Sequence, residues 1–209
     1  MYAPVSTPQA RIEAIANAAA EWREPDHPPR KSAVADTLQA PNRWTEEALD
    51  HALNRWMQRL TPEALADWLG DGAPETPTTV GVLHGPSGPL VGLRDAVAVW
   101  AEGHAYLGHT AKASPALLPA FSRAVVDRAD NIDAEFVGKE PLLERATAVM
   151  AQPAREGADA VHEACDAHGI APEHRLVRPS QVVVAVLDGH EGDDAQGGLA
   201  EDALLYDGG

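Results

Sequence analysis

The chain has 209 residues, and its acidic, lysine-poor composition gives a net charge of −16, from 32 acidic and 16 basic side chains. Such a negative field repels nucleic acids and anionic membranes, and no apolar run is long enough to span a bilayer. The single cysteine excludes an intrachain disulfide, and together with the lack of a visible signal peptide at Met1 it predicts a cytoplasmic protein. The excess of acidic over basic residues is typical of proteins that work at high salt, which predicts a halophilic protein.

The first 75 residues are expected to form an N-terminal helical segment. Apolar residues at helical spacing predict a first helix over 9–23. Four prolines predict that 24–42 is an extended connection. Thr45 and Thr61 precede two further apolar-periodic stretches, and threonine is a good helix N-cap. The residues expected to face inward are Ile12, Ile15, Ala19, Trp22, Leu49, Leu53, Trp56 and Leu60.

Residues 76–209 are expected to form a Rossmann-like domain. Short, nearly continuous apolar runs alternate with stretches of helical periodicity, which is typical of strands buried on both faces of a parallel sheet. The predicted strands are 79–83, 105–108, 134–137, 146–151 and 181–187. This pattern predicts an α/β fold with a mainly parallel sheet and helices on both faces.

Ligands of such sheets bind beyond the carboxyl ends of the strands, which points here to the loops 84–89 and 108–114. The first loop, H-G-P-S-G-P-L-V-G, lacks the spacing of the G-x-G-x-x-G dinucleotide fingerprint. It could still present backbone N–H groups to an anion at the start of a helix. In the second loop, Ser114 is predicted to cap a helix that begins at Pro115.

One group of residues has side chains that can bind a metal ion: His162, Cys165, His168 and His174. Spacings of three along a helix rotate away from one face, so at most two of these side chains can converge, whereas structural zinc needs four ligands. Packing in the core or on the surface is the preferred interpretation, and no metal is expected. Cys165 also has no obvious activating neighbour that would make it a nucleophile.

The order of several segments resembles the acyl-CoA reductases related to the long-chain fatty acyl-CoA reductase of bacterial bioluminescence, a branch of the aldehyde dehydrogenase superfamily. The resemblance covers nearly the whole chain, and the order and spacing of the motifs carry it. The matching segments are TVGVLHGPSGPLVGLRD (79–95), GHAYLGHTAKASPALLPA (103–120), ERATAVMA (144–151), VVVAVLDG (182–189) and LAEDALLYDGG (199–209), with NRWTEEALDHAL (42–53) and PEALADWL (62–69) before them.

This resemblance implies that a nicotinamide dinucleotide reduces a fatty acyl-CoA to an aldehyde through a cysteine thioester, in an enzyme that could be a homo-oligomer. In the family the nucleophilic cysteine follows the segment matched by 199–209, in a G-C-R motif that these 209 residues do not contain. We therefore expect the nucleotide-binding part of such an enzyme without its catalytic domain. The alternative is a truncated or degenerate relative that acts only as a binding or assembly module.

The resemblance also assigns roles to individual positions. Ser87 stands where the family has an asparagine that helps to hold the acyl oxygen, and no residue is assigned to catalysis itself. The expected cofactor-binding residues are His109, at a usual lysine position, Gln152, in place of a T-G-S turn that Pro153 also alters, and Lys112. Lys112 replaces a glutamate that bonds the adenosine ribose, so it either attracts the 2′-phosphate of NADP, favouring NADP over NAD, or is a solvated loop residue.

Overall fold

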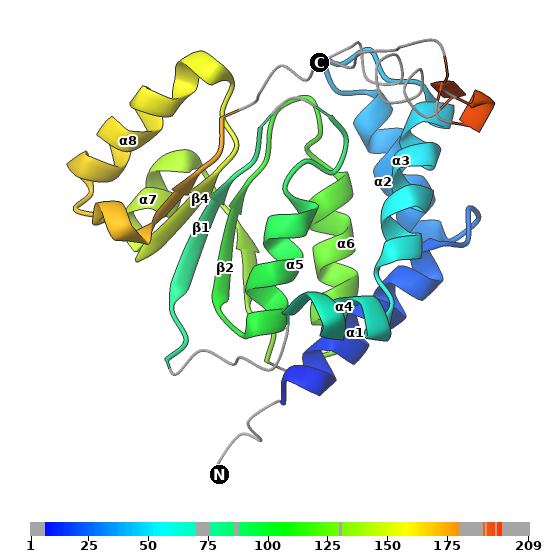
Figure 1. Cartoon of the computed structure of the whole chain (residues 1–209), viewed down its shortest axis with the longest axis horizontal. Coiled ribbons are helices and arrows are strands. Elements are labelled where there is room, and N and C mark those ends of the chain that lie inside the picture. The colour runs from blue at the N-terminus through cyan, green and yellow to red at the C-terminus, as the bar shows by residue number, and fades with distance from the viewer. Residues whose placement is uncertain are drawn as a thin grey trace.

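The computed structural model describes residues 7–69, 76–85, 88–129, 131–179, 190, 192–194 and 196–197. Within these residues, five parallel strands form one sheet with helices on both faces (Figure 1). The strands are β1 (Thr79–Leu83), β2 (Ala105–His109), β3 (Ala134–Phe136), β4 (Ala148–Ala151) and β5 (Arg175–Val177), in the order β3-β2-β1-β4-β5. The predicted α/β fold is confirmed, and β1 to β4 lie within two residues of their predicted positions.

The fifth strand was not predicted. The segment 181–187, for which a strand was predicted, lies outside the described residues, and β5 is instead a three-residue strand that pairs with β4. Strand β5 contains one arginine and is followed by another, so it lacks the continuous apolar pattern of a buried strand. Its position at the edge of the described sheet, with pairing to β4, accounts for its strand conformation.

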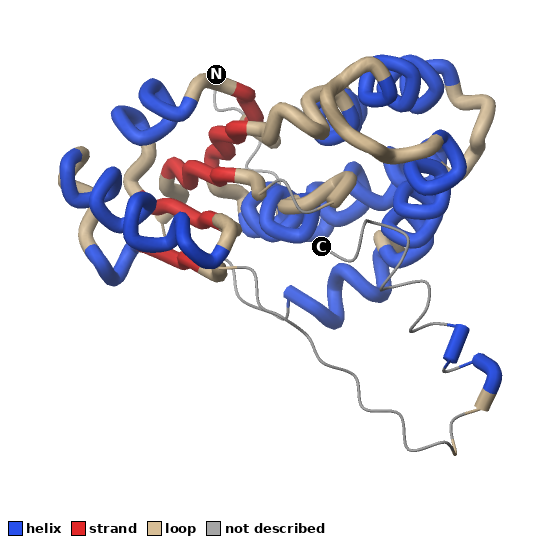
Figure 2. Tube along the Cα trace, turned by 90° about the horizontal axis from the view of Figure 1, so that it is seen from above, coloured by secondary structure: helices blue, strands red, loops and turns tan. Residues whose placement is uncertain are grey.

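Helices cover the two faces of the sheet in separate groups, and Figure 2 shows the strands between them. Helices α5 (Leu93–Glu102) and α6 (Leu117–Val126) pack on one face, over β1, β2 and β3. Helices α7 (Lys139–Arg145) and α8 (Ala158–Ala167) pack on the other face, and the 3₁₀ turns Arg155–Gly157 and Pro172–His174 flank α8. No helix among the described residues is long and apolar enough to cross a membrane.

Alternation along the strands divides the core into two clusters. Val80 and Tyr106 face α5 and α6 in the larger cluster, whereas Leu107 faces α7 and α8 in the smaller one. Gly81 also faces α7, because a Cβ added there would lie 2.4 Å from Cδ2 of Leu142. The lack of a side chain at this position therefore lets α7 approach the centre of the sheet.

The N-terminal helices form an outer layer against α5 and α6 (Figure 1). They are α1 (Pro8–Trp22), α2 (Pro28–Leu38), α3 (Glu46–Arg59) and α4 (Pro62–Leu69). Their buried side chains join the larger cluster of the sheet, and the Trp22 ring meets Phe121 of α6 edge-on at 5.3 Å. This shared core anchors the outer layer, while the boundary at residue 75 stays a prediction.

Two local predictions in the loops were wrong. The extended connection expected over 24–42 contains α2, because Pro28 and Pro29 occupy the first turn of a helix, where proline costs no hydrogen bond. Ser114 does not cap α6: that helix begins at Leu117 after Ala116. The backbone N–H of Ser114 instead donates to the carbonyl of Ala111 at 3.1 Å, which closes a turn before the helix.

Candidate functional site at the carboxyl edge of the sheet

The strand order creates a crevice beside β1. From β1 the chain moves outward to β2 and β3, and it then crosses back to β4 on the other side of β1. The loops that leave β1 and β4 therefore diverge to opposite faces at the carboxyl edge. Such a topological switch point is where open parallel sheets bind their ligands, so this edge is the candidate site.

The β1 and β4 loops touch through their backbones at the switch point. A Cβ added to Gly85 would lie 2.2 Å from the backbone oxygen of Gln152, so only glycine fits there. The N–H of Gln152 donates to the carbonyl of Leu83 at 3.3 Å, which extends the β1–β4 pairing by one residue. The floor of the crevice is thus closed, and a ligand would lie above it.

A buried carboxylate occupies the start of α5. Asp95 lies in the first turn of this helix and is 2% exposed. Its Oδ2 accepts a hydrogen bond from Nε2 of Gln152 at 2.8 Å, and its Oδ1 is paired with the guanidinium of Arg178, just after β5. The helix dipole favours a negative charge here. The position that a ligand anion could occupy at this helix is therefore filled by the protein's own carboxylate.

Beside Asp95 lies a histidine–tyrosine pair. Nε2 of His84, just after β1, is 2.5 Å from Oη of Tyr106 on β2. Burial lowers the pKa of His84 to about 4, a shift that the nearby Asp95 partly opposes. Burial, followed by the charge of Asp95, raises the pKa of Tyr106. Both groups are uncharged at pH 7, so the pair adds no positive charge with which to bind an anion.

The structure places the three predicted cofactor-binding residues along this edge, one after β4 and two at or just after the end of β2. Gln152 follows β4, and its amide is already used by Asp95. His109 ends β2, and its Nδ1 lies 3.0 Å from the carbonyl oxygen of Val137, so its ring is turned toward the loop after β3. Lys112 is exposed in the turn after β2. No hydrogen bond or ion pair joins Gln152 to the other two among the described residues, and Ser87 lies outside those residues.

The turn that carries Lys112 is fixed to the outer helices. Nδ2 of Asn42 donates to the carbonyl of Ala113 at 2.9 Å and to the carbonyl of Thr37, at the end of α2, at 2.8 Å. The N-terminal layer therefore positions a loop of the candidate site. The sequence did not identify Asn42, because its partner in the loop lies 71 residues away along the chain.

The loops after β1 and β2 enclose a cavity of about 10 Å³, which has room for about one water molecule. His84, Leu90, Thr110, Ser114 and Leu118 are among its lining residues. A nucleotide cannot enter a space of this size. Any dinucleotide at this edge would have to lie across the surface of the loops.

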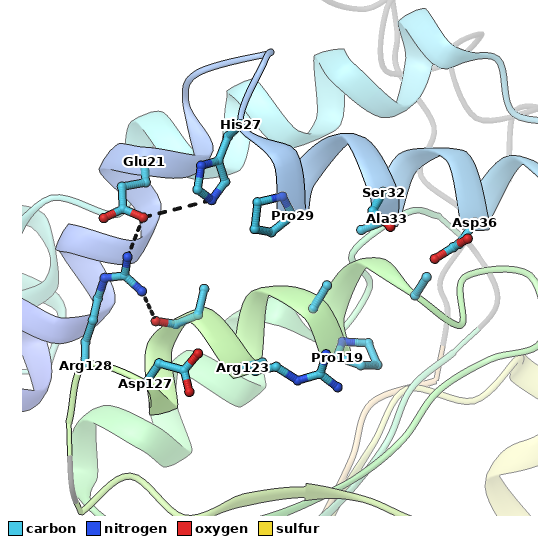
Figure 3. Close-up of a pocket in the computed structure, with 13 residues that line it drawn as sticks. Glu21, His27, Pro29, Ser32, Ala33, Asp36, Pro119, Arg123, Asp127 and Arg128 are labelled. Carbon is cyan, nitrogen blue, oxygen red and sulfur yellow. Dashed lines mark hydrogen bonds and ion pairs between the residues drawn. The ribbon is translucent and has the colours of Figure 1, made fainter.

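A much larger groove, of about 510 Å³, runs between α2 and α6, away from the switch point (Figure 3). At one end Glu21 is paired with Arg128 and lies 3.9 Å from His27. Arg123 and Asp127 add opposite charges along the α6 side. Because these charges are mixed and already partly paired, the groove presents no single chemistry to a ligand.

The four residues considered for a metal site do not converge. Cys165 is buried in the smaller core cluster, and burial raises the pKa of its thiol. His168 is held by the carbonyl of Ala164 at 2.8 Å from its Nδ1, while His162 and His174 are exposed. Within the described ranges, no three His, Cys, Asp or Glu side chains are arranged to hold a metal ion.

Comparison with solved structures finds the same architecture in two known proteins. The chain superposes on a crystal structure of an E. coli NADP dependent enzyme with a TM-score of 0.69 and 12% identity, over 98% of this chain and 46% of that one. It also superposes on a putative aldehyde dehydrogenase, PutA from Anabaena variabilis, with a TM-score of 0.53 and 14% identity, over 83% of this chain and 43% of that one. The shared property is the fold.

The chain thus spans less than half the length of either solved structure. No protein-family model matches the sequence, and no curated protein does. Identities this low establish a common architecture and leave substrate and cofactor to be argued from the residues of the site.

Proposed function

We propose that this chain is the nicotinamide-dinucleotide-binding part of an oxidoreductase, with the cofactor lying across the carboxyl edge of the sheet. The observation that carries the proposal is the switch point between β1 and β4, in a fold shared over 98% of the chain with an NADP dependent enzyme. Open parallel sheets bind ligands at such points, and the first-choice ligand of this strand order is a dinucleotide.

The residues of the edge fit this cofactor best on the β2 side. There Lys112 is exposed, and a lysine attracts a phosphate as a compact charge. The β1 side fits less well, because Asp95, paired with Arg178, already occupies the start of α5. When bound, the cofactor supplies a hydride. The protein's own contribution is to hold the adenosine half near Lys112, whose charge attracts a 2′-phosphate and so favours NADP over NAD.

The finer part of the proposal concerns the substrate. The resemblance to acyl-CoA reductases suggests that the whole protein reduces a fatty acyl thioester to an aldehyde. The sole cysteine of the 209 residues, Cys165, is buried in α8 with a raised pKa, so we assign it no role as a nucleophile. We propose that this stretch of chain binds the cofactor and turns over no acyl-CoA by itself.

One observation favours the alternative, a non-catalytic binding or assembly module. The Asp95 carboxylate accepts from Gln152 and is paired with Arg178 across the switch point, so this charge is already used within the protein. A relative that no longer binds a cofactor could retain such an internally paired edge. The two functions differ in one measurable property, which is the affinity for a nicotinamide dinucleotide.

The test is calorimetric titration of the chain with NADPH and NADH at low salt. We expect both to bind and Lys112→Glu to weaken NADPH by about ten- to a hundredfold, because a charge-assisted hydrogen bond is lost, while NADH changes little. Lys31→Glu makes the same charge change on α2 and should alter neither affinity. High salt should reduce the preference for NADPH. Binding of neither cofactor would refute the proposal and favour the module.

A further inference from the structure

Another pocket, separate from the sheet edge and from the groove between α2 and α6, lies between the outer helices and α5. Its volume is about 290 Å³, and it is lined by the end of α3, by α4 and by the first two turns of α5. Figure 1 shows α4 beside α5, and the two helices are in contact. Leu65 and Val97, both buried, form an apolar floor. This volume is at the lower end of small-ligand pockets and suits a ligand smaller than a dinucleotide.

The walls of this pocket combine two indole rings and two guanidinium groups. Trp56 and Trp68 contribute the rings, and Arg59 and Arg94 contribute the charges. Trp68 is 41% exposed, and both arginines are exposed. A large aromatic ring left this open to water is unusual in a chain that has buried Trp22 and Trp100 completely.

The charge of the pocket is opposite to that of the protein. Among the residues that the structure describes, eight line the pocket and none of these is acidic, although acidic side chains outnumber basic ones two to one in the chain. No hydrogen bond or ion pair of Arg59 or Arg94 is found within the described parts of the chain. An anionic ligand repelled by most of the surface would therefore find a local positive charge here.

The arrangement of Arg94 indicates how such an anion would be held. Its guanidinium carbon lies 5.5 Å from the centre of the Trp68 ring, over the ring. A guanidinium stacked on an aromatic face keeps the N–H donors at its edge free, and these match two oxygens of a phosphate or carboxylate. The exposed indole can stack against a planar ring of the same ligand.

We propose that this pocket binds a planar aromatic anion of the mononucleotide class. Its ring would stack on the indoles of Trp56 and Trp68, and its phosphate would lie on Arg59 and Arg94. Two observations carry the assignment independently: the aromatic walls and the absence of acidic lining in an acidic protein. The site does not depend on the dinucleotide site, because it shares no residue with the switch point.

The test uses AMP as the probe, with adenosine and inorganic phosphate as the two halves of its chemistry. Spectra of the 15N-labelled chain report binding through the indole N–H signals of its five tryptophans. We expect AMP to bind saturably and to shift the signals of Trp56 and Trp68, with Trp22 and Trp100 unchanged. Adenosine and phosphate should each bind at least about tenfold more weakly than AMP.

Two variants and two controls locate the site. Trp68→Leu and Arg94→Gln each change an exposed residue and should weaken AMP by about tenfold or more. Arg123→Gln, an exposed arginine on α6 outside this pocket, should leave AMP binding unchanged. Lys112→Glu, outside this pocket, should leave the AMP-induced shifts of the Trp56 and Trp68 signals unchanged. No saturable binding of AMP, or binding lost in Lys112→Glu and retained in Trp68→Leu, would overturn the proposal.

Discussion

His84 makes a specific contribution to stability that depends on pH. Its ring is packed against Tyr106 and the turn at Gly92, and burial lowers its pKa to about 4 from an ordinary value of 6.5. The charges that face it have opposite effects: Asp95 on α5 raises the pKa and His109 on β2 lowers it. Because the folded protein binds the proton less well than the unfolded chain, acid should favour unfolding.

The direction and size of this change in the free energy of unfolding follow from the two pKa values of His84. Above pH 6.5 His84 is neutral in both states, so its contribution to folding is fully present. As the pH falls from 6.5 toward 4, the unfolded chain gains a proton that the folded chain does not bind. Each pH unit in this window costs about 1.4 kcal/mol, so the free energy of unfolding should drop by about 2 kcal/mol on reaching pH 5.

The assay is urea unfolding followed by tryptophan fluorescence, at pH 7 and pH 5, for the wild type and His84→Gln. Glutamine retains a polar group near Tyr106 but does not titrate. Carboxylates that gain protons in this range do so in both proteins, so the difference between the two losses isolates His84. We expect the wild type to lose about 2 kcal/mol more than the variant. Equal losses in both proteins would refute the burial of a neutral His84.

Three further predictions concern stability and reactivity. Arg30 is 1% exposed, and its guanidinium donates hydrogen bonds to the end of α1, to Asp50 and to Asn54. Arg30→Ala should therefore lower the free energy of unfolding by about 3 kcal/mol. Lys31→Ala, which removes only an exposed ion pair next to it, should cost less than about 1 kcal/mol. Gly92 has a φ of 86° and lies against His84, so Gly92→Ala should cost at least about 2 kcal/mol in the same urea assay. Cys165 should react with a thiol reagent only in urea, and rapid labelling of the native chain would contradict its burial.

The sequence predicted the parts of this fold that repeat a simple pattern. The strands β1 and β2 are short apolar runs between turns, and Gly103 ends α5 with a φ of 84°, as expected for a helix C-terminus. Thr45 caps α3 through a hydrogen bond from the N–H of Ala48. Each of these features depends on residues that are neighbours in the chain, so it can be predicted from a short stretch of sequence.

The features that the sequence did not reveal depend on distant partners. Asp95 and Arg178 are 83 residues apart, and neither has a sequence signal that indicates the other. The prolines at the start of α2 were interpreted as breakers, although the same residues favour a first helical turn. In the candidate site, the sequence predicted loops after the first and second strands, while the internal pairing of Gln152 became visible only with the fold.

The binding of a nicotinamide dinucleotide at the carboxyl edge is tested most directly by mapping the backbone amide signals of the 15N-labelled chain during titration with NADPH. We predict that the perturbed amides cluster at Gly85, at 110–113 and at Gln152 and Ala154, where the loops after β1, β2 and β4 meet the crevice. Amides on α1, a helix of the outer layer that lines neither proposed site, should not move. A titration that perturbs none of the edge loops, or only residues of the outer helices, would contradict the account.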